Sequence, residues 1–262
     1  MELTDKRINF LSVPVDALSM EETVNIINDS IREDRRIQHV AINASKAVSM
    51  QDDEELYESI INCDIVNADG QSIVWAARFL GKYLPERVAG IDLMENLVDL
   101  AFREKYKCFF FGAKEEIVVA LVKKYTEKYT SDIIAGYRNG YYIKTEEAEI
   151  ARQIAESGAN ILFVAITSPK KEIFLNTHKN ILKKINFTMG VGGSFDVIAG
   201  LTKRAPGWMQ NIGLEWLFRL IQEPRRMWKR YVIGNFQFIR LILNEKYKKT
   251  NEKNNTYLRN PS

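Results

Sequence analysis

Short apolar runs alternate with amphipathic helical stretches through most of the chain, and this alternation limits the fold more than any other feature. The expected strands are 38–43, 107–113 and 159–167, together with a strand and turn in 64–70, a strand and loop in 132–142, and a strand and glycine turn in 186–196. The expected helices are 45–63, 71–81, 92–106, 115–129, 145–158 and 170–184. Strands that alternate with helices of this length form βαβ units, whose strands run parallel. The sequence therefore predicts an α/β fold with a mostly parallel sheet flanked by helices.

Small or polar residues stand at the predicted carboxyl ends of several strands. They are Asn43, Asp69, Gly112, Ser168 and Gly192. Ligands of open parallel sheets bind in the crevice beyond those ends. We therefore expect a single site at this edge of the sheet.

Asp69 lies in the segment NADGQS, where a strand turns into a helix. A carboxylate in this place can act as a general base toward an attacking hydroxyl group. It can instead cap the helix that begins near Gln71, because aspartate is favoured at helix N-termini. The spacing alone favours the cap.

Two further segments carry cations. Arg87 lies in PERVAG, and an arginine fork suits a diphosphate. The residues alone favour the alternative, a surface arginine that pairs with Glu86 or Asp92. Lys171 lies in TSPKKE, where a helix is expected to start beside the site. It can meet an anion there or remain solvated.

A glycine turn follows the last predicted strand, in MGVGGSFDVIAG. Gly192 and Gly193, followed by Ser194 and Asp196, allow backbone N–H groups to face a phosphate or a nucleoside. The segment matches neither the G-x-G-x-x-G fingerprint nor a P-loop. A tight turn without a ligand is the alternative.

The net charge of +3 is unevenly distributed along the chain. From Thr202 onward there are 13 Lys and Arg against 4 Asp and Glu, a net of +9, so the preceding part carries −6. A basic end of this kind indicates an anionic partner, which can be phospholipid, nucleic acid or pyrophosphate.

The chain divides into three parts by composition. Residues 1–204 form the predicted catalytic body, 205–248 a helical, aromatic and basic appendage, and 249–262 a polar end expected to be disordered. Basic residues among tryptophans suit an interfacial helix on anionic lipid. A core helix with a solvated basic face and an RNA-binding segment are the alternatives.

The sequence also bears on location. We expect a cytoplasmic protein, because the N-terminus lacks the features of a signal peptide and the chain has no apolar run long enough to span a bilayer. Cys63 and Cys108 are its two cysteines, which fits a reducing compartment.

Four segments together resemble one family, the WecG/TagA/CpsF glycosyltransferases. They are ADGQSIVWAARFLGKYLPERVAGIDLM, FFFGA, SPKKE and MGVGGSFDVIAGLTKRAPGWMQNIGLEWLFRLIQEPRRMWKRY, which lie in unbroken order between Asn43 and Tyr231. The resemblance implies a Rossmann-like body and a C-terminal appendage that completes the active site at the membrane. It implies a peripheral position on the inner face of the plasma membrane.

The resemblance also implies a reaction. A sugar passes from a UDP-sugar to an undecaprenyl-diphosphate-linked saccharide with inversion, without a metal or other cofactor and without nucleic acid as a partner. Asp69 is implied as the base, with Asn43 and Arg87 beside it, and Arg219 and Arg226 as appendage arginines. We expect substrate contacts from Gln71, Gly112, Ser168, Lys171, Gly192, Gly193, Ser194, Asp196, Arg204, Arg219 and Arg226.

Two positions depart from the teichoic acid members of that family. Ala41 stands where they have threonine, and Lys171 where they have glutamine. A lost hydroxyl and a gained charge change what a pocket recognises, so the donor is N-acetylmannosamine or a related sugar. The charge of Lys171 can favour a uronic acid or stabilise the departing diphosphate.

Two other functions remain as alternatives. A non-catalytic nucleotide- or RNA-binding module explains the basic end and the glycine turn, but gives no reason for Asp69 beside Asn43. A nicotinamide-dependent enzyme is disfavoured by the missing fingerprint. The sequence leaves a homo-oligomer open.

Overall fold

The computed structural model describes residues 6–259. Within that span it does not describe the side chains of residues 211, 226, 227, 229, 230 and 249–259. The predicted side-chain role of Arg226 therefore lies outside the described residues, although its backbone belongs to a helix.

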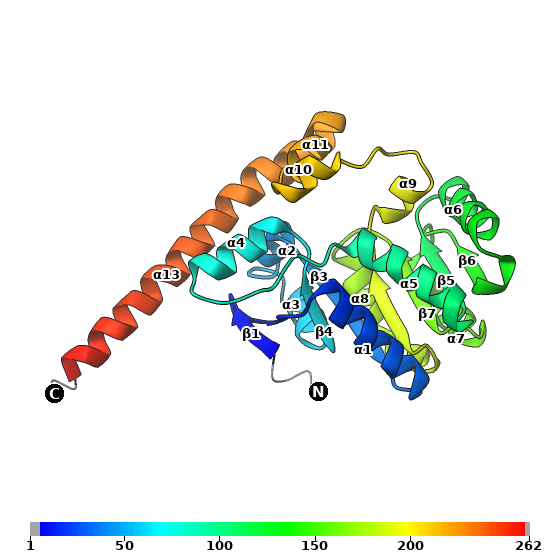
Figure 1. Cartoon of the computed structure of the whole chain (residues 1–262), viewed down its shortest axis with the longest axis horizontal. Helices are drawn as coiled ribbons and strands as arrows, with labels where there is room; N and C mark the ends of the chain where they lie inside the picture. Colours follow the sequence, from blue (N-terminus) through cyan, green and yellow to red (C-terminus); the bar gives the residue numbers. More distant parts are fainter. Residues whose placement is uncertain (1–5, 260–262) are drawn as a thin grey trace.

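A six-stranded parallel sheet forms the centre of the molecule, as the sequence predicted (Figure 1). Its order is β4-β3-β8-β7-β5-β6, with every neighbouring pair parallel. The strands are β3 (Ile37–Ile42), β4 (Ile65–Ala68), β5 (Cys108–Gly112), β6 (Ile134–Arg138), β7 (Ile161–Ala165) and β8 (Phe187–Gly190).

Helices cover both faces of the sheet, because successive strand residues point to opposite sides. Phe110 and Phe163 pack with α1 (Met20–Arg32), α5 (Gly90–Glu104) and α6 (Glu115–Lys128). Phe109 and Phe111 pack with α7 (Glu147–Glu156) and α8 (Lys170–Thr177) on the other face. The shorter helices of the body are α2 (Ala44–Ser49), α3 (Glu54–Ile61), α4 (Gln71–Phe79), η2 (Ser131–Ile133), η3 (Lys144–Glu146), η4 (Ile181–Lys184) and α9 (Ser194–Ile198).

An N-terminal hairpin, β1 (Arg7–Phe10) and β2 (Val13–Asp16), was not predicted. The carboxylate of Asp16 accepts a hydrogen bond from the backbone N–H of Val66, at 2.7 Å, and pairs with Arg7. These bonds fasten the hairpin beside β4, the strand that ends just before Asp69.

The single helix expected over 45–63 is wrong. The chain forms α2 and α3 instead, and Asp53 caps α3 by accepting a hydrogen bond from the N–H of Leu56 at 2.9 Å. An aspartate immediately before a helical run is a strong N-cap signal, which the apolar periodicity hides here.

The C-terminal part is helical, as predicted. It contains α10 (Gly207–Asn211), α11 (Glu215–Gln222), α12 (Pro224–Trp228), the π-helical turn η5 (Lys229–Ile233) and the long α13 (Gly234–Arg259). Phe238 and Ile242 of α13 are buried against the body, and the Phe238 ring centroid lies 6.5 Å from that of Phe10.

Helix α13 continues to Arg259, so regular structure extends through most of the stretch that was expected to be disordered from residue 249. The helix also packs onto the body rather than standing apart from it, while the predicted domain limits stay a prediction. Among the described helices, not one combines the length and the apolar character that crossing a membrane requires.

Candidate active site

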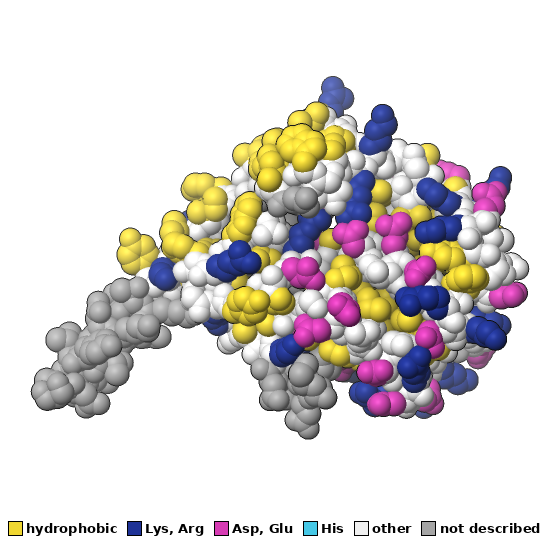
Figure 2. Space-filling model, in the orientation of Figure 1, with side chains coloured by type: hydrophobic (Ala, Val, Ile, Leu, Met, Phe, Trp, Pro, Cys, Tyr) yellow, Lys and Arg dark blue, Asp and Glu magenta, His cyan; other side chains and the backbone are white. Residues whose placement is uncertain are grey.

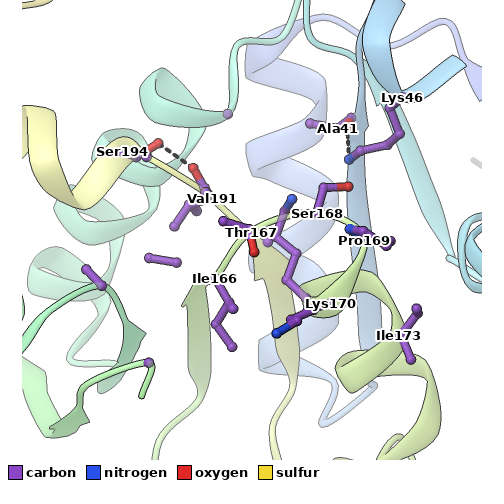
Figure 3. Close-up of a pocket in the computed structure, with 18 of the residues that line it drawn as sticks. Ala41, Lys46, Ile166, Thr167, Ser168, Pro169, Lys170, Ile173, Val191 and Ser194 are labelled. Atoms are coloured by element: carbon purple, nitrogen blue, oxygen red, sulfur yellow. Dashed lines mark hydrogen bonds between the residues drawn. The ribbon is translucent and has the colours of Figure 1, made fainter. Parts of the chain in front are cut away.

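A cleft of about 1180 Å³ opens at the carboxyl ends of β3, β4, β5, β7 and β8 (Figure 3). Helix α11 contributes Glu215 and Arg219 to its lining. The cleft thus lies at the edge of the sheet where ligand binding was expected. The predicted site residues that line the cleft are Asn43, Asp69, Ser168, Lys171, Gly192, Gly193, Ser194, Asp196 and Arg219.

Asp69 follows β4 directly, and its carboxylate is not the cap of α4. The N-cap of α4 is Gly70, which makes no side-chain cap, so the capping alternative for Asp69 is wrong. Its Oδ1 instead accepts a hydrogen bond from the N–H of Gly90, at 3.3 Å, across the cleft edge. Burial raises the pKa of Asp69, and the nearby Glu215 raises it further, while Arg219 opposes both.

Asn43 follows β3 and caps α2, because its Oδ1 accepts a hydrogen bond from the N–H of Lys46 at 3.0 Å. A Cβ on Gly70 would lie 3.9 Å from the Cβ of Asn43, so the ends of β3 and β4 are close together. The asparagine therefore has a structural task and also faces the ligand space beside Asp69.

The glycine turn connects β8 to α9. Gly192 has φ +56°, a conformation that favours glycine. Ser194 donates its hydroxyl proton to the carbonyl oxygen of Val191, at 2.8 Å, which fixes the turn (Figure 3). Gly192 and Gly193 line the cleft and have no side chain that would separate their backbone from a ligand.

Three buried charges form what we call the cleft floor: Lys46, Lys171 and Glu172. The Glu172 carboxylate lies 2.9 Å from Lys46 Nζ and 2.8 Å from Lys171 Nζ. Burial alone would raise the pKa of Glu172, but the two lysines lower it to about 2. Lys46 also donates to the carbonyl oxygen of Ala41 at 2.6 Å, and the Lys171 chain fills the space where a Cβ on Gly190 would lie.

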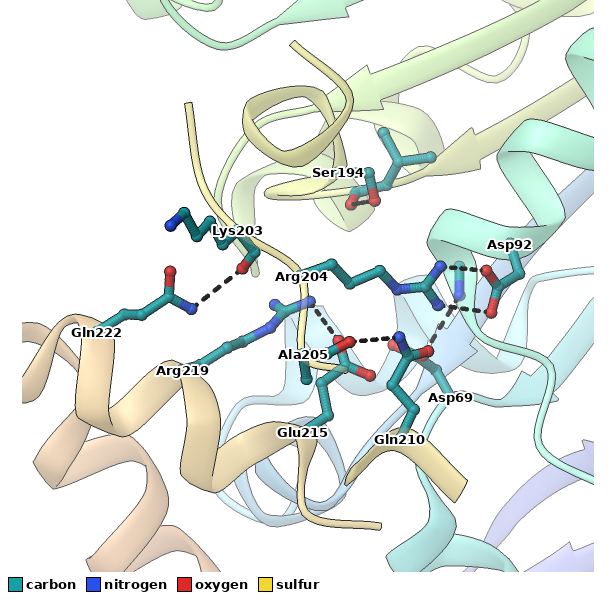
Figure 4. A network of polar contacts seen from close by, with 12 residues as sticks. Asp69, Asp92, Ser194, Lys203, Arg204, Ala205, Gln210, Glu215, Arg219 and Gln222 are labelled. Atoms are coloured by element: carbon teal, nitrogen blue, oxygen red, sulfur yellow. Dashed lines mark hydrogen bonds and ion pairs between the residues drawn. The ribbon is translucent and has the colours of Figure 1, made fainter. Parts of the chain in front are cut away.

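A second group of charges, Arg87, Glu215 and Arg219, forms what we call the cleft wall. Glu215 and Arg219 line the cleft (Figure 4), and Arg87 lies behind them as a partner of Glu215. Glu215 Oε2 lies 3.2 Å from Arg87 Nη1, and its Oε1 accepts a hydrogen bond from Arg219 Nη2 at 2.8 Å. Arg87 also approaches the side-chain oxygen of Gln210, at 3.4 Å. Arg87 thus pairs with α11 rather than with Glu86 or Asp92, its predicted surface partners.

Four predicted site residues do not line the cleft: Gln71, Arg87, Gly112 and Arg204. The Arg204 fork binds Asp92 through two bonds of 2.5 and 2.7 Å, which fastens the chain before α10 to α5. Gly112 has φ +129°, and a Cβ there would lie 2.5 Å from the backbone of Ala165, so glycine serves close packing. Substrate contacts by these four residues stay a prediction.

Sequence reasoning missed Lys46, Glu172 and Glu215. Lys46 and Glu172 are 126 positions apart, and Arg87 and Glu215 are 128 apart, so no local pattern joins them. The one available signal was the acidic residue beside Lys171 in SPKKE, because a buried lysine requires a partner.

Most of the chain, including every residue of this cleft, is similar to one known protein family. The family described as glycosyl transferase WecG/TagA/CpsF matches residues 8–252. The chain belongs to the WecG/TagA/CpsF family of glycosyl transferases. This WecG/TagA/CpsF protein is therefore an enzyme, and the non-catalytic alternative is not supported.

Two relatives carry the name N-acetylglucosaminyldiphosphoundecaprenol N-acetyl-beta-D-mannosaminyltransferase. The protein from Bacillus subtilis is 33% identical over 209 residues, which is 80% of each chain. The protein from Bacillus spizizenii is 34% identical over 175 residues, or 66% of each chain. The WecG/TagA/CpsF protein is thus similar to transferases whose acceptor is a sugar on undecaprenyl diphosphate.

Proposed function

We propose that this glycosyltransferase moves N-acetylmannosamine or a related sugar, such as a uronic acid, from its UDP form onto an undecaprenyl-diphosphate-linked saccharide. The product would serve the synthesis of a bacterial surface polysaccharide or teichoic acid. The names of the relatives support the acceptor class and the transferred sugar. The observation that carries the proposal is Asp69, a strand-end carboxylate that lines the cleft and is not engaged as a helix cap.

The proposed reaction is a direct displacement. Asp69 accepts the proton of the acceptor hydroxyl while that oxygen forms a bond to the anomeric carbon. The bond from that carbon to the UDP oxygen breaks on the opposite face, which inverts the anomeric centre. The charge that develops on the departing diphosphate is met by cationic side chains and backbone N–H groups rather than by a metal ion. The presence of Arg219, Lys171 and the glycine turn in the lining of the cleft supports this assignment.

Replacing Asp69 by Asn tests the role of the base. The amide cannot accept the proton, so we expect transfer to fall by about 10²- to 10⁴-fold. Binding of UDP, measured by calorimetry, should change little because the carboxylate does not hold the nucleotide. The exposed Asp132→Asn is the matched control. Near-normal turnover in the Asp69 variant would remove this residue from the mechanism.

The donor is the least defined part of the proposal. Ala41 offers no hydroxyl toward the cleft, and its carbonyl oxygen is taken by Lys46. Lys171 brings a second lysine to the single carboxylate of Glu172. The floor thus holds two basic side chains and one carboxylate, a balance that suits an anionic group of the donor. A sugar carboxylate and the diphosphate both supply that chemistry.

We further propose that the enzyme binds the membrane surface through its C-terminal helices. Large apolar side chains gather over α10, α11 and α13 on the visible face (Figure 2). Interfacial helices bind anionic lipid through such an apolar face together with nearby basic residues. The exposed apolar residues of this part are Trp208, Ile212, Ile221, Trp228, Val232, Ile233, Phe236, Ile239, Leu243 and Tyr247.

Sedimentation with vesicles of phosphatidylglycerol and phosphatidylcholine measures this binding. The double variant Phe236→Ser, Ile239→Ser removes two exposed apolar side chains from α13 and should weaken partitioning about tenfold or more. Val119→Ser, an exposed apolar position on α6, should leave partitioning unchanged. Equal binding of the α13 variant and the unaltered chain would contradict the proposal.

A further inference from the structure

Glu215 connects the C-terminal helices to the body at the edge of the cleft. It is the first residue of α11, and it pairs with Arg87 of the body and with Arg219 one helical turn further along α11. The side chains of Arg87 and Glu215 are each 16% exposed, so both are largely shielded from water. Glu215 and Arg219 also line the cleft with Asp69.

The charges that act on Asp69 come from three elements. Glu215 and Arg219 belong to α11, and Lys46 belongs to α2, while Gly90 at the start of α5 offers its backbone N–H. Only Glu215 among these opposes ionisation of the carboxylate. Glu215 itself pairs with Arg87 and Arg219, and it also interacts electrostatically with the more distant Arg204.

We infer that Glu215 is a positioning residue for the transfer reaction: it holds Arg219 at the cleft and places a negative charge beside Asp69 when α11 is docked on the body. The inference rests on the proposed role of Asp69 as the base. A carboxylate that ionises less readily is a stronger proton acceptor once ionised. Docking of the C-terminal helices and the basicity of Asp69 are therefore coupled through one side chain (Figure 4).

The sign of the effect separates this role from simple docking. Glu215→Gln removes the negative charge and leaves Arg87 and Arg219 nearby, so the pKa of Asp69 falls. Arg219→Gln removes a positive charge and leaves Glu215, so the pKa of Asp69 rises. Both variants break the same Glu215–Arg219 ion pair. If the residues only held α11 in place, both would loosen it and shift the pKa in the same direction.

The test is a ¹³C NMR titration of the full-length chain labelled at the aspartate carboxyl carbon, with Asp69→Asn used to assign the resonance. We expect the pKa of Asp69 to move down in Glu215→Gln and up in Arg219→Gln, each by about half a pH unit or more. Glu215→Asp keeps the charge and should restore most of the effect. Arg225→Gln, an exposed arginine in α12, is the control and should cause no shift.

Shifts in the same direction, or no shift in either variant, would overturn the inference. Far-UV circular dichroism identifies any variant that fails to fold. If Glu215→Gln does not fold, the pKa of Asp69 is compared between Glu215→Asp and the unaltered chain. The outcome is also separable from the proposed function. If Asp69→Asn loses transfer but Glu215→Gln and Arg219→Gln do not shift the pKa in opposite directions, only the inferred role of Glu215 is wrong. If Asp69→Asn retains transfer, the proposed role of Asp69 as the base is wrong.

Discussion

The floor and the wall of the cleft share one charge pattern, a carboxylate between two cations, in two different settings. The floor carboxylate is Glu172, and the side chains of the floor are 4–9% exposed. The wall carboxylate is Glu215, and the side chains of the wall are 16–38% exposed. The cost of a charge that loses its partner is largest for a fully buried group and decreases as water reaches the group. We therefore expect the floor charges to matter mainly for the stability of the fold, and the wall charges mainly for the pKa of Asp69 and the position of Arg219.

The two regions also differ in how the chain supplies them. The floor side chains come from α2 and α8, which follow β3 and β7 of the sheet through short connections. The wall depends on α11, which lies beyond the last strand and is connected to the body by ion pairs and by the packing of α13. A change in the floor should thus act on stability, and a change in the wall on activity.

The largest effect is expected in the floor. Glu172→Gln leaves Lys46 and Lys171 buried without a carboxylate, and breaking a buried pair costs about 3–5 kcal/mol. Urea unfolding followed by circular dichroism measures the loss. Glu149→Gln, whose pair with Arg152 is more than half exposed, should cost less than about 1 kcal/mol. Similar losses in the two variants would remove the distinction between a buried floor and an exposed pair.

The next effect concerns the anchor of the wall. Phe238→Ala removes a ring that is 5% exposed and packs against Phe10, so we expect a loss of about 3 kcal/mol in unfolding free energy. Because α13 follows α11, loosening α13 should also disturb the wall. We therefore expect transfer activity to fall even at a low temperature at which the variant remains folded. Phe236→Ala, 71% exposed on the same helix, is the matched control for stability. Full activity in Phe238→Ala would show that the wall does not depend on this anchor.

The smallest effect tests the charge of the floor as a recognition element. Lys171→Gln leaves Lys46 as the partner of Glu172, so the fold should persist. If a sugar carboxylate binds there, kcat/KM for a UDP-uronic acid should fall about tenfold or more, while that for UDP-N-acetylmannosamine should not. A diphosphate contact predicts an equal fall for both donors.

The control for this donor comparison is Lys170→Gln. Lys170 is the neighbouring lysine, it is exposed, and it also lines the cleft. Unchanged kinetics for both donors in Lys171→Gln would exclude Lys171 from recognition of the donor.

The sheet was predictable because its strands, apart from the partly buried edge strand β6, are short, mostly apolar runs that are buried on both faces. The hairpin was not, because its strands have four residues each and one of them contains Pro14. The division into α2 and α3 was hidden by a helical periodicity that continues across the capping residue Asp53.

The site was predictable where local chemistry marks it, and less so where distant segments meet. Asp69 and the glycine turn lie at strand ends, which the pattern of strands and helices identifies. The pairing of Arg204 with Asp92, and of Arg87 with Glu215, depends on how α10 and α11 pack, which no short-range pattern encodes.

The contact between Lys171 and Gly190 links two positions that are far apart in the sequence. A Cβ at position 190 would lie 2.7 Å from Lys171 Cδ, so the lysine side chain would have to shift to accept any other residue there. The present course of the Lys171 side chain thus favours glycine at 190, while a shorter side chain at 171 would leave room for alanine. In the evolution of related chains these two positions should change together, and their joint history would record when the floor of the cleft was remodelled.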